Sequence, residues 1–269
     1  MVQFLVLGTL EVVHDDCVLD LGRAEQRALL ALLLVHANQV VAADRIVAVL
    51  WPGNLPADPS AAVQVEVSLL RQVLARCGRN AQAVLEEREP GYVLHVGDDE
   101  LDAARFEGLV EAGRIALAVG WMGEAAVHLG SALGLWRGDA LADFAGQLFV
   151  HDEATRLREL RLGAVEDWIE AELVLGHHAT VVGELRRLAD SYPLREPLWA
   201  QLILALYRSD RQAEALRAFG RLRDNLAGAL GIDPSPALQQ LAERVRLQKP
   251  DLEWRPPATG AAEDDYGGR

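Results

Sequence analysis

The chain has 269 residues, 51 % of them hydrophobic and 25 % charged, which suits two domains that each bury a core. No apolar run reaches the roughly 18 residues that a membrane-spanning helix needs, and no basic segment precedes the first apolar stretch as in a secretion signal. We therefore expect a cytoplasmic protein with no membrane contact. The two cysteines, Cys17 and Cys77, lack metal-ligand spacing and are interpreted as reduced thiols.

Charge limits the surface that this chain can offer to a partner. The formal net charge is −14, and Lys249 is the only lysine among 26 basic residues. Residues 1–98 hold 7 arginines against 12 acidic residues, a net charge of −5; residues 99–250 hold 17 basic against 23 acidic residues, a net charge of −6. Phosphate contacts supply most non-specific affinity for nucleic acids. A chain this acidic could therefore bind a nucleic acid only through a local basic patch on its surface.

Short strands are predicted at the start of the chain. β-Branched or alternating runs occupy residues 2–7, 10–14 and 17–21, and Gly8-Thr9 and Asp15-Asp16 separate them as turn signals. A small antiparallel sheet follows from this pattern.

Three helices are predicted next, over residues 24–36, 45–51 and 61–77, from the helical spacing of their apolar side chains. Ser60 is the expected N-cap of the third helix, and Gly78 the expected stop.

Two further strand-like runs, residues 83–86 and 92–96, are joined through Pro90-Gly91 and predict a β-hairpin. Three helices followed by a hairpin are typical of a winged helix, a helix-turn-helix variant whose third helix can enter a major groove.

The chain from residue 99 to about 248 has helical periodicity throughout. Trp168 and Trp199 hold similar places in successive blocks, and Leu185 and Phe219 are separated by 34 residues, the period of a tetratricopeptide unit. We therefore predict stacked helical hairpins, with an irregular helical bundle as the alternative. For four tryptophans, packing between helices is favoured over a place in a ligand groove: Trp121, Trp136, Trp168 and Trp199.

The predicted fold is mainly α with a small β component. It consists of a winged-helix domain over residues 1–98, an all-helical tetratricopeptide-like domain over residues 99–250, and a disordered acidic tail over residues 251–269.

Motifs for catalysis, cofactors or metals are not found in the sequence. It contains no glycine-rich phosphate loop, no HExxH and no GxSxG motif. His177 and His178 are adjacent, so on a helix they would point about 100° apart. We expect a protein that is not an enzyme and that carries no cofactor and no metal.

Eight stretches of this chain, taken together and in order, carry a family resemblance: residues 21–34, 44–52, 63–71, 90–94, 135–141, 196–199, 212–219 and 230–236. They resemble the SARP family, the actinobacterial antibiotic-regulatory activators, in which an OmpR/PhoB-type winged helix precedes a bacterial transcriptional activation domain. The resemblance implies a regulator that binds direct repeats in promoters upstream of a biosynthetic gene cluster. It also implies side-by-side protomers on DNA and recruitment of RNA polymerase.

Candidate DNA-binding residues follow from a third helix that buries Val63, Val67, Leu70 and Leu74. Its outward side chains can pair with base edges, Gln with adenine and Arg with guanine, while Ser can contact either a base or a phosphate. These are Gln64, Ser68, Arg71 and Gln72.

Phosphate contacts are expected from Arg23, Arg27 and Arg45. In the hairpin, Arg88 could reach a minor groove or a phosphate, with Tyr92 beside it. The alternative for each arginine is a solvated or ion-paired surface role, and for Tyr92 a core position under the wing.

This surface departs from the family pattern. Family members commonly carry basic residues at the positions of Glu25, Leu69 and Gln72, and an aromatic residue or histidine at the position of Glu66. A carboxylate at Glu66 would repel phosphates unless a residue such as Arg88 paired with it. Two hypotheses follow: a DNA-binding activator with reduced basic surface, and a SARP-like subunit that binds DNA weakly and acts on a partner or ligand through its helical domain.

Overall fold

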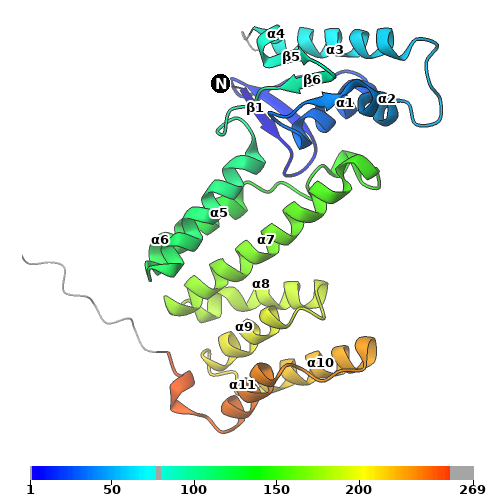
Figure 1. Ribbon diagram of the computed structural model, residues 1–269. Coiled ribbons are helices and arrows are strands. Elements are labelled where there is room, and N and C mark those ends of the chain that lie inside the picture. The colour runs from blue at the N-terminus through cyan, green and yellow to red at the C-terminus, as the bar shows by residue number, and fades with distance from the viewer. Residues whose placement is uncertain (1, 77–79, 255–269) are drawn as a thin grey trace, which may run out of the picture. The chain divides into compact units, whose positions relative to one another are not determined.

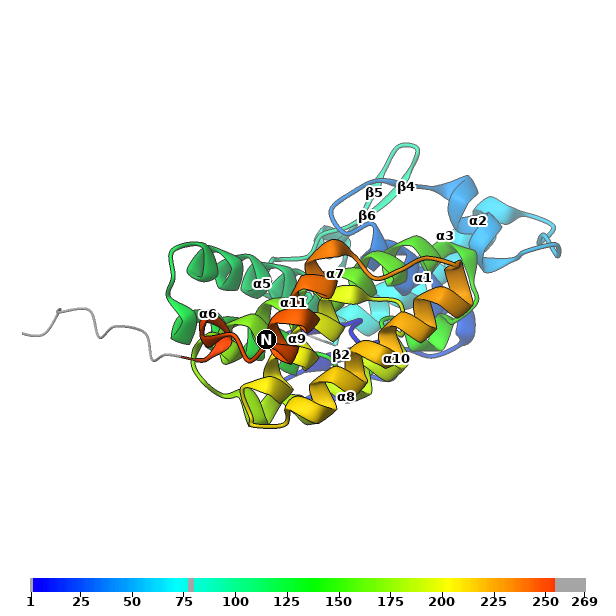
Figure 2. The same ribbon diagram turned by 90° about the horizontal axis from the view of Figure 1, so that it is seen from below.

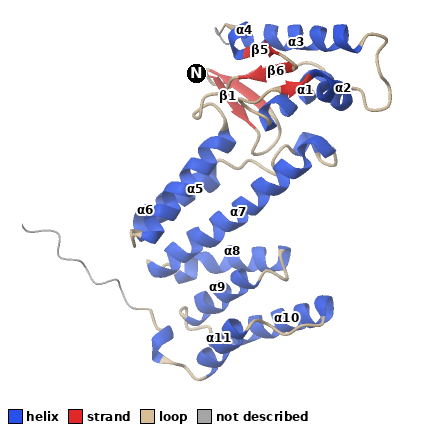
Figure 3. Cartoon of the chain, in the orientation of Figure 1, coloured by secondary structure: helices blue, strands red, loops and turns tan. Residues whose placement is uncertain are grey.

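The computed structural model describes residues 2–76 and 80–254, so Cys77, Gly78 and most of the predicted tail lie outside the described residues. Strands occur only in the first part of the described chain, and helices make up the rest (Figures 1 and 3). The predicted fold class, mainly α with a small β component, is confirmed. None of the described helices combines the length and apolar character needed to cross a membrane.

The first sheet is antiparallel, in the order β1-β2-β3, and consists of β1 (Val2–Leu5), β2 (Glu11–His14) and β3 (Cys17–Val18). The predicted strands are confirmed, although the third is shorter than expected. The turn between β2 and β3 is Asp15-Asp16, with φ of 47° and 64°. Positive φ at both positions matches the right-handed twist of a tight hairpin, and aspartate tolerates it better than most residues.

The three predicted helices are confirmed as α1 (Ala24–Val35), α2 (Ala43–Leu50) and α3 (Pro59–Ala75). Their apolar side chains form one core, which includes Leu29, Leu33, Ile46, Leu70 and Leu74. The second sheet has the order β4-β6-β5 and consists of β4 (Val41–Ala42), β5 (Leu85–Arg88) and β6 (Gly91–Leu94). β5 and β6 form the predicted hairpin.

Two local predictions in this region are wrong. The N-cap of α3 is Asp58 rather than Ser60: its carboxylate accepts from the backbone amide of Ala61 at 3.0 Å, and Pro59 occupies the first helical turn. Proline lacks an N–H and has a φ suited to that place, so the cap lies before it. Ala83 and Val84 belong to a short helix, α4 (Ala81–Val84), because Asn80 caps it through Gln82 N.

The remaining helices are α5 (Asp102–Ala118), α6 (Met122–Gly134), α7 (Leu148–Val174), α8 (His178–Ser191), α9 (Glu196–Tyr207), α10 (Gln212–Leu230) and α11 (Pro236–Arg246), with 3-10 turns η1 (Ala142–Phe144) and η2 (Pro250–Leu252). The expected helical hairpins are therefore present. Gly120 and Gly176, with φ of 84° and 91°, make the turns after α5 and α7. A Cβ on Gly176 would lie 2.6 Å from the Trp254 ring, so this turn requires glycine.

The chain forms two compact units, one of residues 1–111 and 130–164 and the other of residues 112–129 and 165–269. In the first unit, the buried carboxylate of Asp102 accepts from the amides of Val6 and Leu7 at 2.8 and 3.0 Å. The amide of Arg137 donates to the Leu7 carbonyl at 2.8 Å. These bonds connect the first sheet to the start of α5 and to the segment after α6.

In the second unit, α8 packs on α9 and α9 packs on α10, with α11 against both α9 and α10 (Figure 2). Trp199 on α9 is fully buried, and its indole N–H donates to the Pro193 carbonyl at 3.2 Å. Trp136, in the first unit, is half-buried edge-on against Phe106, whereas Trp121 is exposed. Core packing thus describes Trp199 and does not describe Trp121.

The expected disorder from residue 251 is wrong for its first four residues. Leu252 is buried, its carbonyl accepts from Arg208 Nε at 3.0 Å, and Arg244 pairs with Asp251. The Trp254 indole donates to the Val174 carbonyl at 2.8 Å. The second unit therefore includes this segment. Its apolar residues do not form a helical stripe, but they pack and hydrogen-bond to side chains and carbonyls of α7, α11 and the end of α9.

Candidate nucleic-acid interface

The outer face of α3 presents uncharged side chains. Gln64, Ser68 and Gln72 are exposed, as predicted, and make no side-chain hydrogen bond to other described residues. Between them lies Val65, whose exposed fraction is 54 %. Val65 was not among the residues predicted to face outward, because a valine on an amphipathic helix normally belongs to the core. Its position in the stripe, one residue after Gln64 and three before Ser68, was the available signal.

Arg71 lies at the edge of this face and is half-buried. Its Nε and Nη2 donate to the Leu85 carbonyl at 3.0 and 2.7 Å, where β5 begins. Hydrogen bonds from a charged donor to a carbonyl hold both groups in place. The guanidinium therefore fastens the wing to α3 and directs two of its donors away from the helix's outer stripe.

Glu66 is buried, with 8 % of its side chain exposed, and Arg23 Nη2 pairs with its Oε1 at 2.8 Å. The partner is thus Arg23, at the start of α1, and not Arg88. Its Oε2 is buried and has no hydrogen-bond partner among the described residues. The expectation of a carboxylate displayed toward DNA is wrong, because Glu66 faces α1 and its charge is offset by a guanidinium that is itself 63 % exposed.

The wing carries a polar cluster on its outer side. Arg88 pairs with Glu86 at 2.7 Å, and His95 Nε2 lies 2.8 Å from the same carboxylate. These contacts, the hydrogen bond with His95 foremost, lower the pKa of Glu86. Tyr92 is buried in β6, and desolvation raises the pKa of its phenol. The structure thus puts Arg88 at the surface of the wing and Tyr92 beneath it.

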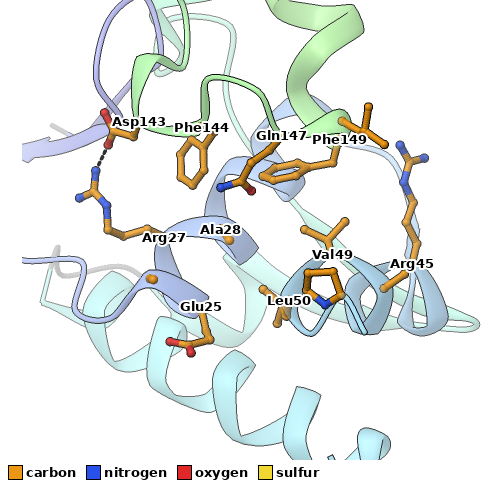
Figure 4. Close-up of a pocket in the computed structure, with 14 residues that line it drawn as sticks. Glu25, Arg27, Ala28, Arg45, Val49, Leu50, Asp143, Phe144, Gln147 and Phe149 are labelled. Carbon is orange, nitrogen blue, oxygen red and sulfur yellow. Dashed lines mark hydrogen bonds and ion pairs between the residues drawn. The ribbon is translucent and has the colours of Figure 1, made fainter. Parts of the chain in front are cut away.

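Arg27 and Arg45 lie apart from the α3 stripe, on a groove of about 750 Å³ between α1, α2 and residues 143–149 (Figure 4). Arg27 donates to the Leu10 carbonyl at 3.3 Å and forms an ion pair with Asp143. Arg45 makes no ion pair within residues 2–76 and 80–254. Apolar side chains line the groove between them: Val49, Leu50, Phe144, Leu148 and Phe149.

The structure brings Gln64, Ser68 and Gln72 together on the outer face of α3, whereas Arg23 pairs with Glu66 on another side of the helix and Arg88 lies on the wing. It does not bring Arg27 or Arg45 onto that face. Most of the arginines predicted to contact phosphate are therefore already bonded within the protein, which leaves few cations to release counterions from a nucleic acid.

Comparison with known proteins decides the family. Residues 101–246 match the bacterial transcriptional activator domain, and residues 18–94 match the C-terminal domain of transcriptional regulatory proteins. Regulatory protein DnrI of Streptomyces peucetius is 34 % identical over 265 residues, which cover 97 % of each chain. The chain belongs to the SARP family of transcriptional regulators. The family expected from the sequence motifs is confirmed.

Other SARP relatives are longer than this chain. Transcriptional regulatory protein EmbR of Mycobacterium tuberculosis is 40 % identical over 248 residues, which are 92 % of this chain and 64 % of EmbR. Regulatory protein AfsR of Streptomyces coelicolor is 38 % identical over 251 residues, 25 % of its length. A structure of EmbR in complex with a low-affinity phosphopeptide aligns with a TM-score of 0.88 at 39 % identity, over 93 % of this chain and 66 % of that one.

Proposed function

We propose that this SARP protein is a sequence-specific DNA-binding activator that reads a promoter with the outer face of α3. The observation that carries the proposal is the stripe of Gln64, Ser68 and Gln72, exposed and without partners in the described protein, on the third helix of a winged helix. Amide and hydroxyl side chains on a helix that enters the major groove can pair with base edges. Phosphate contacts are proposed for Arg23 and Arg88, whose side chains are 63 % and 52 % exposed, and Arg71 is proposed to position the wing.

The partners proposed for this activity are double-stranded DNA with direct repeats, a second protomer on the same DNA, and subunits of RNA polymerase. Membership of the SARP family supports the first two of these partners. The acidic helical domain, with a net charge of −6 over residues 99–250, suits a protein with a basic surface better than a nucleic acid. A biosynthetic gene cluster for a secondary metabolite is the proposed target. The domain boundary at residues 98 and 99 belongs to the same proposal, and the two family matches lie on either side of it.

A binding titration tests the activator. Labelled duplexes from the regions upstream of its own gene neighbourhood are titrated with the full chain at several low salt concentrations, and the dissociation constants are read by fluorescence anisotropy. We expect at least one region to bind far more tightly than a scrambled duplex, with a shallow dependence on salt because few phosphates are neutralised. Failure to bind any region at micromolar protein would contradict the proposal.

A second candidate function is a SARP-like subunit that binds DNA weakly and acts through its helical domain. It is favoured by the net charge of −5 over residues 1–98 and by the internal bonding of Arg23, Arg27, Arg71 and Arg88. In the same titration this candidate gives equal, weak affinity for every duplex, which separates it from the activator.

A further inference from the structure

The outer stripe of α3 contains no charged side chain over most of its length. The exposed residues of the helix are Ser60, Ala61, Gln64, Val65, Ser68, Gln72 and Ala75, and charges appear only at its two caps, Asp58 and Arg76. Two ionised residues on α3 are turned away from the stripe: Glu66 toward Arg23 and Arg71 toward the Leu85 carbonyl. What a major groove would meet is therefore amide, hydroxyl and methyl groups.

Those groups match one kind of base pair. Glutamine pairs through its amide with the N6 and N7 atoms of adenine, and apolar side chains contact the C5-methyl group of thymine. Guanine is read most often by arginine or lysine, and α3 turns its one interior arginine toward the wing. The chemistry of the stripe thus complements A·T pairs and lacks the usual reader of G·C pairs.

Val65 is not packed in the hydrophobic core, so burial does not explain a valine at this position. Its side chain is 54 % exposed, although valine loses side-chain freedom in a helix and is a mediocre helix former. Ser68 and Gln72, three and seven positions after Val65, lie on the same side of the helix, so a base pair contacted by Ser68 lies within reach of the Val65 methyl groups.

We propose that α3 reads a half-site rich in A·T pairs, and that Val65 determines specificity by contacting the C5-methyl group of a thymine. This rests on the proposed DNA-binding function and names the sequences that function would select. Gln64 and Gln72 read adenines in the same half-site. Arg71 is a positioning residue that holds the wing and reads no guanine.

The test uses the full chain and begins with selection of bound duplexes from a randomised pool at low salt. Each thymine of the selected half-site is then replaced by deoxyuridine, which removes only the C5-methyl group. Dissociation constants are measured for the native chain, for Val65→Ala and for Val127→Ala, a control that changes an exposed helical valine on α6.

We expect A·T pairs at the selected positions. Replacement of one particular thymine should weaken binding about fourfold for the native chain and the control, the value of burying one methyl-sized group. The same replacement should leave the affinity of Val65→Ala unchanged. Both variants change exposed residues, so neither should disturb the fold.

Each other outcome is decisive. Selection of guanine at positions whose preference disappears in Arg71→Ala overturns the inference. The inference is also overturned if all three proteins respond equally to deoxyuridine. In both cases the protein still binds DNA, so the proposed function is not contradicted. No binding to any member of the pool at micromolar protein overturns the proposed function, and the inference falls with it.

Discussion

Arginine serves two different ends in this protein, and the contact between α3 and the wing in the first unit and the outer faces of α8 and α10 in the second unit illustrate them. In the first unit, Arg71 is half-buried and donates twice to one carbonyl, and Arg23 neutralises a buried carboxylate. In the second unit, Arg187 and Arg221 are themselves exposed and pair with the exposed carboxylates of Glu184 and Asp190. The residue type and the contact distances are alike, and the surroundings differ.

The solvent exposure of a polar contact decides how much it contributes to the free energy of unfolding. Water solvates both partners of an exposed ion pair and screens their attraction, so such pairs contribute little. A partly buried donor whose acceptor lies in the core has no such substitute, and its loss leaves a carbonyl unsatisfied. The same residue type therefore fastens the wing to α3 and forms solvated pairs on α8 and α10, and Arg208 shows that part-buried contacts from arginine to a carbonyl occur in the second unit as well.

The largest effect is expected at Arg71. Arg71→Ala removes both hydrogen bonds to the Leu85 carbonyl and should lower the free energy of unfolding by about 1.5–3 kcal/mol, as measured by urea denaturation. Arg45→Ala, which removes an exposed arginine without an ion pair in the described part of the chain, is the control and should change it by less than about 0.5 kcal/mol. Equal effects would abolish the contrast between the two kinds of arginine.

A change at Glu66 tests whether its ion pair with Arg23 lowers the affinity of the protein for DNA. Glu66→Gln removes a negative charge and frees Arg23, so DNA affinity at low salt should rise severalfold and the salt dependence should steepen by up to about one counterion. Glu124→Gln on α6 is a matched control. Weaker binding by a folded Glu66→Gln protein would show instead that the carboxylate orients Arg23 toward DNA.

The pKa values of two carboxyl groups should be shifted in opposite directions. Burial raises the pKa of Asp102 in the first unit above 3.8, despite hydrogen bonds from Val6 and Leu7, whereas hydrogen bonds from Arg211 and Arg186 lower the pKa of Glu214 in the second unit to about 2. Stability from Glu214 is present above pH 4.5 and is lost as the pH falls toward 2. Stability associated with Asp102 is greatest at low pH and is lost as the pH rises through its raised pKa.

Carboxyl ¹³C shifts followed by NMR over a pH titration measure both groups directly. A midpoint for Asp102 below that of an ordinary aspartate would show that its backbone hydrogen bonds outweigh its desolvation. A midpoint for Glu214 near 4.5 would show that its arginine pairs do not persist in solution.

The smallest effect is expected at an exposed pair. Asp190 and Arg221 lie 2.6 Å apart, with 57 % and 60 % of their side chains exposed. Asp190→Ala should change the free energy of unfolding by less than about 0.5 kcal/mol in urea denaturation, because the pair is solvated and an acid near a helix C-terminus is unfavourable. A loss comparable to that of Arg71→Ala would mean that exposure does not decide the contribution.

Much of the architecture followed from local patterns. Periodicity and turn residues predicted α1, α2, α3 and the β5–β6 hairpin to within a few residues, because the core-facing stripe and the turn signals are properties of short segments. The cap at Asp58 and the short α4 were missed, since Ser60 and the run from Ala83 satisfied the same local rules. Residues 251–254 were misassigned because their packing depends on α7, α11 and Arg208 at the end of α9, which no local pattern reveals.

The candidate site divides in the same way. The exposure of Gln64, Ser68 and Gln72 could be predicted from helix geometry alone, because residues three and four apart share a face. The partners of Arg71 and Glu66 could not be predicted. Leu85 lies 14 residues after Arg71, and Arg23 lies 43 residues before Glu66, so both contacts exist only once β5 and α1 pack against α3.

The sequence alone was enough to identify the family, most of the helices and strands in their order, and the outward positions of Gln64, Ser68 and Gln72 on α3. The roles of the charged residues on α3 depend on the packed structure, because a long arginine or glutamate side chain takes whichever partner the packed neighbours offer. Folding turned Glu66 and Arg71 toward the protein and left amides, a hydroxyl and Val65 on the outer face.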